Sequence, residues 1–252
     1  IDRFPADMLT LSGVARRYPN GLTALAGIDL MIRPGSFTSI LGPSGCGKST
    51  LIRLLAGLDE PSEGVIAGRP DGGIGLVFQD ATLMPWADVE SNVYLPLRLA
   101  GIARAAAQAR IGEALSLVGL KDFARAYPRA LSGGMRMRVS IARALVTEPT
   151  LLLMDEPFAA LDEITRFKLN EDLLRLWRDR GFTIVFVTHS VFESVYLSTE
   201  IAIMTGRPGR IHALRPVDGP QPRTPEFRTS QLYLEACRAV SQDLERAMGA
   251  AS

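Results

Sequence analysis

The sequence predicts an α/β protein that has an at least partly parallel sheet and a helical insert in its middle. Strand and helix patterns alternate early in the chain and again late in it, while the segment between them is mainly helical. The 252 residues are enough for one large domain, or for a domain with an embedded subdomain. With 47% hydrophobic and 22% charged residues, the composition is globular and excludes extensive disorder.

Short apolar runs bounded by glycine and proline turns predict strands in the first third of the chain. The run Phe37–Leu41 is interpreted as a buried strand, and a glycine-rich turn and a helix over about residues 49–58 follow it. The strands expected in this part cover residues 9–14, 28–32, 37–41, 65–67 and 74–78.

Helical spacing dominates from about residue 88 to residue 145, and strand patterns return after it. The later strands are expected at 151–154, 184–187, 201–204 and 210–214, with a helix over about 164–178. A proline-rich connector leads to a final helix over about 229–248, whose expected apolar face consists of Leu232, Ala236, Val240, Leu244 and Ala247.

These changes in pattern divide the chain into four expected regions. Residues 1–87 form the first part of the core, 88–145 the helical subdomain, 146–214 the rest of the core, and 215–252 a connector and helix. We interpret five arginines between residues 207 and 228 as a solvated surface rather than as a basic binding edge; they are Arg207, Arg210, Arg215, Arg223 and Arg228.

Charge, cysteine content and hydropathy limit the classes of protein. The net charge of +1 gives no broad attraction to nucleic acid, so we expect no nucleic-acid partner. Two cysteines, far apart, exclude a disulfide scaffold and favour a reducing compartment. No run of about 18 apolar residues is present, so we expect no membrane span. The opening Ile-Asp-Arg-Phe-Pro lacks the character of a secretion signal, and a start at Ile1 instead of methionine leaves the true N-terminus open.

The segment from Gly42 to Ser49 matches the phosphate-binding pattern G-x-x-x-x-G-K-[ST]. Glycines let consecutive backbone N–H groups converge on phosphate oxygens, and the helix start adds a favourable dipole end. Lys48 is expected near the β- and γ-phosphates, and the Ser49 hydroxyl is expected to ligate Mg²⁺. A plain glycine turn is the alternative, but the match lies at the strand-to-helix junction that the chemistry requires. The candidate phosphate-binding residues are Gly42, Pro43, Ser44, Gly45, Cys46, Gly47, Lys48, Ser49 and Thr50.

Two carboxylates, Asp155 and Glu156, end the apolar run that begins at Leu151. Apolar side chains require burial and carboxylates require water or a cation, and a strand end beside a phosphate loop satisfies both. We expect Asp155 to hold Mg²⁺ and Glu156 to polarise an attacking water. An acidic cap on the following helix is the alternative, because carboxylates favour first turns.

A second loop with anion-binding character, Leu131-Ser132-Gly133-Gly134-Met135, precedes a helical segment. Taken with the phosphate loop and the acidic strand end, it resembles the signature of the nucleotide-binding subunit of ATP-binding cassette (ABC) transporters, over about residues 9–214. The resemblance implies a P-loop NTPase core, an antiparallel β part at the N-terminus, an inserted helical subdomain, and hydrolysis of ATP with Mg²⁺.

The same resemblance assigns roles to four single residues. It implies that Tyr18 stacks on adenine and that Gln79 senses Mg²⁺ and the attacking water. It also implies that Asp162 lies in a loop that crosses between subunits and that His189 contacts the γ-phosphate. Each has an ordinary alternative: a surface tyrosine, an exposed amide, a helix cap and a core histidine.

The roles that follow from the motifs and the resemblance form three groups. The catalytic residues are Glu156, His189 and Gln79, and the metal ligands are Ser49, Gln79 and Asp155. The nucleotide-binding residues outside the phosphate loop are Tyr18, Ser132, Gly133, Gly134 and Asp162.

Two positions depart from the family pattern. Met135 stands where the signature most often has glutamine, and Ser190 replaces the aspartate that commonly follows the switch histidine. Because the essential groups of the signature are the Ser132 hydroxyl and the glycine amides, we expect activity to survive. The Ser190 replacement leaves the orientation of His189 open.

The family resemblance also implies partners. In the family two subunits pack head to tail, with ATP between the phosphate loop of one and the signature loop of the other. We therefore expect a second copy of this chain, membrane permease subunits and, indirectly, a substrate-binding protein as partners. The expected location is peripheral, on the cytoplasmic side of the inner (plasma) membrane.

The segment 78–86, which ends in Trp86, resembles the nitrate/sulfonate/taurine importer branch. So do Thr188-His189-Ser190, Tyr196-Leu197-Ser198 and Arg207-Pro208-Gly209-Arg210. An exposed Trp86 would need a partner to cover it, whereas packing on its own helical subdomain is the alternative. Another ABC system, either an exporter or a non-transport ATPase, is the alternative function. The helical insert is too short for the long coiled coil of DNA-repair relatives.

Overall fold

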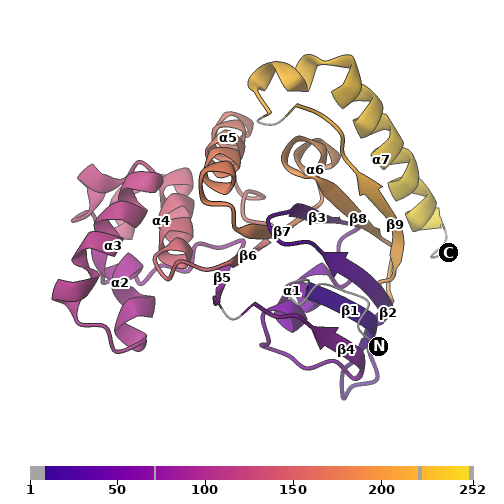
Figure 1. The fold of residues 1–252 in the computed structure, drawn as a ribbon, viewed down its shortest axis with the longest axis horizontal. Helices are drawn as coiled ribbons and strands as arrows, with labels where there is room; N and C mark the ends of the chain where they lie inside the picture. The colour runs from indigo at the N-terminus through magenta and orange to yellow at the C-terminus, as the bar shows by residue number, and fades with distance from the viewer. Residues whose placement is uncertain (1–8, 71, 221–222, 250–252) are drawn as a thin grey trace.

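The computed structural model describes residues 9–70, 72–220 and 223–249 (Figure 1). The opening Ile-Asp-Arg-Phe-Pro and the outer ends of the first and last expected regions lie outside the described residues. Two sheets form the body of the protein: a three-stranded sheet in the order β2-β1-β4 and a six-stranded sheet in the order β5-β6-β7-β3-β8-β9.

The three-stranded sheet is antiparallel. Strand β1 (Leu9–Arg17) pairs with β2 (Thr23–Ile32) on one side and with β4 (Glu63–Ala67) on the other. A turn that includes Gly21, with a φ of 83°, joins β1 to β2, which places Tyr18 at the end of the sheet. The expected antiparallel β part near the N-terminus is therefore confirmed.

The six-stranded sheet is parallel from β5 (Ile74–Val77) through β6 (Leu151–Asp155), β7 (Thr183–Thr188), β3 (Phe37–Leu41) and β8 (Glu200–Met204). Only the edge strand β9 (Ile211–Pro216) of this sheet runs antiparallel. Because parallel strands end at the same edge, the segments that follow β3, β6 and β7 meet there. The phosphate loop, Glu156 and His189 all follow these strand ends.

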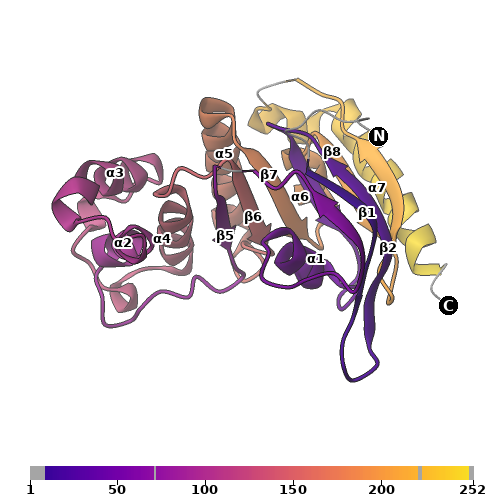
Figure 2. The ribbon, with the colours of Figure 1, turned by 60° about the horizontal axis from the view of Figure 1, so that its bottom comes forward.

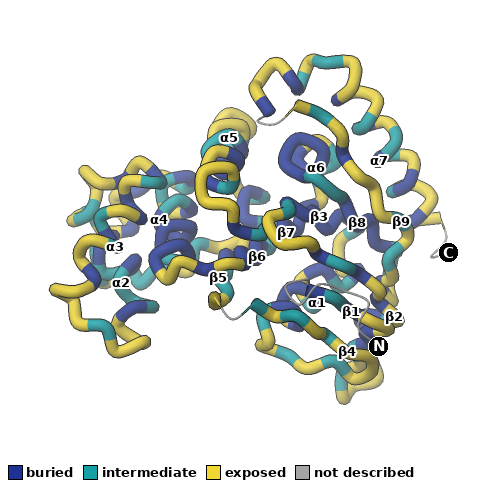
Figure 3. Tube along the Cα trace, in the orientation of Figure 1, coloured by how far each residue is buried: buried dark blue, intermediate teal, exposed yellow. Residues whose placement is uncertain are grey.

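The central strands are buried on both faces, which explains their nearly continuous apolar character. In β6, Leu152 and Met154 belong to one core cluster, while Leu151 and Leu153 belong to the other. Helix α1 (Lys48–Leu55) contributes its apolar residues to the second cluster, together with β1 and β2. Figure 3 shows the buried residues along these strands, so the phosphate loop rests on rigid, packed elements.

The middle of the chain folds as helices to one side of the sheet (Figures 1 and 2). They are α2 (Val89–Leu99), α3 (Arg104–Leu117) and α4 (Gly133–Leu145), with short 3₁₀ turns η1 (Lys121–Phe123) and η2 (Pro128–Ala130). Helix α5 (Glu163–Arg180) follows β6, and α6 (Val191–Leu197) follows β7. The residue boundaries of the four expected regions stay a prediction.

The C-terminal part differs in detail from the expectation. Turn η3 (Pro225–Thr229) precedes α7 (Gln231–Gly249), whose buried face includes Tyr233, Cys237 and Val240. Leu232, expected on that face, is 44% exposed, because the helix is rotated so that the position after it points inward. None of the helices in the described ranges is long and apolar enough to cross a membrane.

One arginine of the expected solvated surface is buried. Arg223 is 5% exposed, and its guanidinium donates hydrogen bonds to the carbonyls of Val195, Tyr196 and Val217. Burial lowers the pKa of Arg223 to about 10. This arginine therefore holds the connector against α6, and the interpretation as a solvated side chain was wrong for it.

Candidate functional site

The glycines of the phosphate loop occupy conformations and spaces that side chains would not fit. Gly47 has a φ of 106°, and a Cβ there would lie 2.7 Å from Leu25 Cδ2 and 2.8 Å from the carbonyl oxygen of Ala24. Gly47 is also the N-cap of α1, so no side chain caps this helix. Side chains do cap α4 and α5, through Ser132 and Asp162. The start of α1 is therefore left open to an external anion.

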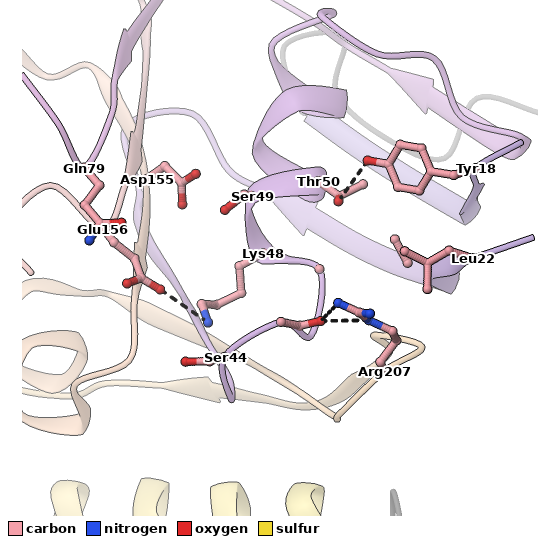
Figure 4. Close-up of a pocket in the computed structure, with 13 residues that line it drawn as sticks. Tyr18, Leu22, Ser44, Lys48, Ser49, Thr50, Gln79, Asp155, Glu156 and Arg207 are labelled. Atoms are coloured by element: carbon pink, nitrogen blue, oxygen red, sulfur yellow. Dashed lines mark hydrogen bonds and ion pairs between the residues drawn. The ribbon is translucent and has the colours of Figure 1, made fainter. Parts of the chain in front are cut away.

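Lys48 folds back over its own loop. Its Nζ donates hydrogen bonds to the carbonyl oxygens of Gly42 at 2.9 Å and Pro43 at 3.0 Å, and lies 3.5 Å from Glu156 Oε1 (Figure 4). The side chain is 5% exposed. A buried cation held beside the loop amides is suited to bind phosphate oxygens.

Cys46 is packed inside the loop. It is 1% exposed, and a Cβ at Gly42 would lie 2.9 Å from its Sγ. Burial raises the pKa of the Cys46 thiol, which disfavours the reactive thiolate. Cys46 therefore contributes backbone and packing to the loop, and its thiol is shielded.

A cavity of about 280 Å³ opens in front of the loop. Figure 4 shows Tyr18 and Leu22 at one end of it and Gln79, Asp155 and Glu156 at the other. The Tyr18 hydroxyl lies 3.3 Å from Thr50 Oγ1, which ties this aromatic ring to α1. The lining residues are Tyr18, Leu22, Ala24, Ser44, Gly45, Gly47, Lys48, Ser49, Thr50, Gln79, Asp155, Glu156 and Arg207.

Asp155, Ser49 and Gln79 provide the oxygen ligands that Mg²⁺ prefers. The Oδ1 atom of Asp155 is buried and has no hydrogen-bond partner among the described residues. Burial raises the pKa of Asp155; the hydrogen bond from Ser49 opposes this shift, and the Glu156 charge adds to it. The described residues contain no cluster of three His, Cys, Asp or Glu side chains that would hold a metal alone. The set therefore fits a cation that takes its other ligands from phosphate and water.

Glu156 and His189 lie at the ends of adjacent strands. The Oε2 atom of Glu156 is 3.2 Å from His189 Nδ1. Glu156 has a φ of 47°, and its backbone N–H donates to the carbonyl of Val187, so the carboxylate is fixed from the backbone. This pair can accept a proton from a water in the cavity and share it.

Ser190 has a defined role in this structure. Its N–H donates to Thr188 Oγ1 at 3.0 Å, and its hydroxyl accepts from the N–H of Glu193 as the N-cap of α6. These bonds fix the backbone on the C-terminal side of His189. The serine therefore supplies the cap that an aspartate at this position could also supply.

The signature loop lies outside the cavity lining and packs against the Asp162 loop instead. A Cβ at Gly134 would lie 2.6 Å from Thr165 Cγ2, and one at Gly133 would lie 3.3 Å from Leu161 Cδ2. Ser132 accepts a hydrogen bond from the N–H of Met135 at 3.2 Å. The fold thus brings Ser132, Gly133, Gly134 and Asp162 into one group, separate from the cavity.

Asp162 caps the N-terminus of α5. Its Oδ1 accepts a hydrogen bond from the Thr165 N–H at 2.9 Å. That bond holds the pKa of Asp162 below its ordinary value. The carboxylate is therefore fixed at the start of the helix, beside the signature loop.

Sequence reasoning missed three lining residues: Leu22, Ala24 and Arg207. Leu22 and Ala24 carry no chemical signal. Arg207 was interpreted as surface, yet its Nε and one terminal nitrogen donate to the carbonyl of Gly45 at 3.1 and 3.0 Å. Arg207 comes from the loop after β8, far from the phosphate loop in sequence, so no spacing rule connects them.

A phosphate loop at a strand-to-helix junction, with a carboxylate pair at the end of another parallel strand of the same sheet, defines a nucleoside triphosphatase of the P-loop class. Residues 25–159 match the ABC transporter family. The chain is 44% identical over 236 residues to the aliphatic sulfonates import ATP-binding protein SsuB of Bacillus subtilis, covering 90% of this chain and 91% of that protein. It is 41% identical over 244 residues to the taurine import ATP-binding protein TauB of Yersinia pestis, covering 94% and 92%.

A solved structure agrees with these relatives. The dimeric, post-hydrolysis ATP-binding cassette MJ0796 bound to ADP and Pi matches with a TM-score of 0.72 and 33% identity, covering 84% of this chain and 99% of that one. The chain belongs to the ABC transporter family, as an ATP-binding subunit in the nitrate/sulfonate/taurine importer branch. It is an ATPase coupled to transport. The fold class and family expected from the sequence are confirmed.

Proposed function

We propose that this chain hydrolyses ATP as a head-to-tail dimer and drives uptake of a small sulfonate-, taurine- or nitrate-like solute through a separate permease. The proposal of a dimer depends on one observation: within one chain the signature loop lies apart from the phosphate loop. Ser132 and Asp162 do not line the cavity formed by the phosphate loop of the same chain. Two copies packed head to tail would bring one chain's Ser132 loop to the other's cavity, and the MJ0796 cassette is a dimer.

Within each half-site the lining residues have separate roles. The loop amides and Lys48 bind the phosphates, and Tyr18 stacks on the adenine at the other end of the cavity. Glu156 accepts the proton of the attacking water as that water bonds to the γ-phosphorus and ADP leaves. His189 is not one of the cavity-lining residues but lies 3.2 Å from Glu156; it holds this carboxylate, and we expect it to reach the γ-phosphate.

Ser49, Gln79 and Asp155 would hold Mg²⁺, which when bound neutralises charge on the phosphate oxygens. The buried, unpartnered oxygen of Asp155 supports this assignment. Gln79 lines the cavity and lies on the same short segment as Trp86. We expect a movement of Gln79 on nucleotide binding to be passed along this segment to Trp86.

An apolar surface beside that segment supports a permease partner. Trp86 is 77% exposed, so it does not pack on its own helical subdomain. Leu99 of α2 is exposed as well, and with Phe78 it lines a second cavity, of about 310 Å³, between β5, α2 and α4. Arg143 of α4 donates to the carbonyl of Thr82 at 2.8 Å, which holds the Trp86 segment in place. A membrane subunit that covered this surface would hold the chain at the membrane. We propose the cytoplasmic face as the side.

Purification from native membranes in mild detergent tests the proposal. We expect permease subunits to co-purify with the chain, and taurine, alkanesulfonate or nitrate, presented with its binding protein, to stimulate ATP hydrolysis in reconstituted vesicles. Lys48→Ala should co-purify equally but not hydrolyse ATP. Co-purification with a nucleic acid or with no membrane protein would contradict the proposal. If the solute stimulated ATP hydrolysis without a binding protein, when added on the side of the vesicle membrane where ATP is bound, the result would indicate an exporter.

A further inference from the structure

A segment after β8 reaches across to the phosphate loop. Arg207 donates two hydrogen bonds from one guanidinium to the carbonyl oxygen of Gly45, at 3.1 and 3.0 Å (Figure 4). Gly45 lies in the middle of the phosphate loop, and both residues line the cavity. A side chain from a distant part of the sequence therefore holds the loop from outside.

Backbone contacts fix the position of this segment. The Gly209 N–H donates to the carbonyl of Ala24 at 2.9 Å, and the Ala26 N–H donates to the carbonyl of Gly209 at 3.0 Å. A Cβ at Gly209 would lie 2.1 Å from the carbonyl oxygen of Cys46, so the segment touches the phosphate loop directly. Arg207 thus extends from a support that is itself anchored on β2.

The charge of Arg207 is free for another partner. Lys48, the other cationic residue of the lining, is 3.5 Å from Glu156. Arg207 makes no ion pair with a carboxylate among the described residues; the Gly45 carbonyl is the only acceptor that its side chain engages within them. A carbonyl oxygen without a hydrogen-bond donor would repel a nearby polyphosphate. A carbonyl oxygen that accepts from a guanidinium, as that of Gly45 does, would not.

We propose that Arg207 is a positioning residue for nucleotide binding, which fixes the Gly45–Cys46 peptide and adds a second positive charge beside the phosphate loop. Because the peptide is planar, fixing the Gly45 carbonyl also fixes the direction of the Cys46 N–H, which donates to the carbonyl of Pro43 at 3.3 Å in this structure. A loop held in its binding conformation loses less entropy when ATP arrives. This inference rests on the proposed function, because it requires ATP in this cavity.

Three variants separate the contributions of charge and geometry. Arg207→Ala removes both, Arg207→Gln keeps a hydrogen-bond donor without charge, and Arg207→Lys keeps the charge without the fork. The matched control is Arg210→Ala, because Arg210 is exposed in the same segment and donates to the carbonyl of Ala26, but does not line the cavity.

The measurements are dissociation constants for ATP and ADP by calorimetry at low and high salt, and KM and kcat for ATP. We expect Arg207→Ala to weaken ATP binding and raise KM about five- to twentyfold, with kcat within about threefold of wild type. The ATP affinities and KM values of Arg207→Lys and Arg207→Gln should lie between those of wild type and those of Arg207→Ala. The penalty of Arg207→Ala and Arg207→Gln should shrink at high salt, because the screened charge is the part they lose. Arg210→Ala should bind ATP like wild type.

Three results would overturn the inference: wild-type affinity in Arg207→Ala, an equal loss in Arg210→Ala, or a fall in kcat at unchanged KM. Thermal unfolding of each variant checks the fold, and if Arg207→Ala unfolds, the same criteria apply to Arg207→Gln and Arg207→Lys. If wild type binds no ATP, the proposed function fails. If wild type binds ATP, Lys48→Ala does not, and the Arg207 variants match wild type, only this inference fails.

Discussion

Replacing Glu156 with glutamine removes the proton-accepting charge from the proposed catalytic pair and keeps the shape of the side chain. The backbone N–H of residue 156 still bonds to Val187, so the strand end should be unchanged. Glutamine also keeps an oxygen within reach of Lys48 and His189, which lie 3.5 and 3.2 Å from the carboxylate. The variant therefore tests proton acceptance by residue 156 without changing the local structure.

The expected loss in turnover is about 10²- to 10⁴-fold, which corresponds to about 3–5 kcal/mol in the barrier. ATP binding should be kept or strengthened, because one negative charge is removed beside the phosphates. Because the proposed dimer is held by ATP bound between two chains, a variant that binds ATP without hydrolysing it should accumulate as a closed, ATP-bound dimer.

Three assays check this together: steady-state phosphate release, ATP affinity by calorimetry, and the oligomeric state by light scattering with and without ATP. Glu235→Gln is a matched control, because Glu235 is exposed on α7 and remote from the cavity. Turnover within threefold of wild type, at unchanged Mg²⁺ dependence, would refute the assignment of Glu156 as the base. A monomer at saturating ATP would refute the closed dimer.

Three further outcomes follow from the structure. Trp86→Ala should leave ATP hydrolysis of the isolated chain within about twofold and reduce co-purification of the permease at least about tenfold, since truncating an exposed aromatic anchor mainly costs binding; normal complex recovery would contradict the assigned surface. Asp243→Asn should lower the free energy of unfolding by about 1 kcal/mol at pH 7, because the hydrogen bond from Arg215 holds the pKa of Asp243 below its ordinary value. That stability is present above the ordinary pKa near 4 and is lost as the pH falls through the lower folded value, so urea denaturation should show a smaller difference at pH 3 than at pH 7. A bulky maleimide should label Cys46 at least about tenfold more slowly than free cysteine, because the thiol is buried with a raised pKa, and ATP should slow it further; mass spectrometry showing rapid, ATP-independent labelling would contradict the packing of the loop.

Local patterns in the sequence predict most of the individual parts of the site. The glycine spacing around Lys48 predicts an anion-binding loop, because only glycine tolerates the backbone of Gly47. An apolar run followed by Asp155 and Glu156 predicts a buried strand with a cation at its end. Such rules work because each depends on the chemistry of a few consecutive residues.

The expected face of the last helix shows where such rules are weaker. Helical periodicity predicts an apolar stripe along α7, but it does not decide which apolar residues at the edge of the stripe are buried. The packing partners decide between them: Tyr233 and Cys237 point inward, while Leu232 is left 44% exposed. The ion pair of Asp243 with Arg215 of β9 adds a polar contact that no pattern within the helix predicts.

By itself, the sequence determined the class of fold, the phosphate loop and the acidic strand end, since these depend on residues adjacent in the chain. Only the tertiary structure decided which distant residues meet: His189 with Glu156, Gly134 with Thr165, and Arg207 with the carbonyl of Gly45. The physical reason is that packing brings together segments that are distant in the chain, and the parallel sheet gathers several of them at one edge. A contact between such segments leaves no periodic trace along the chain.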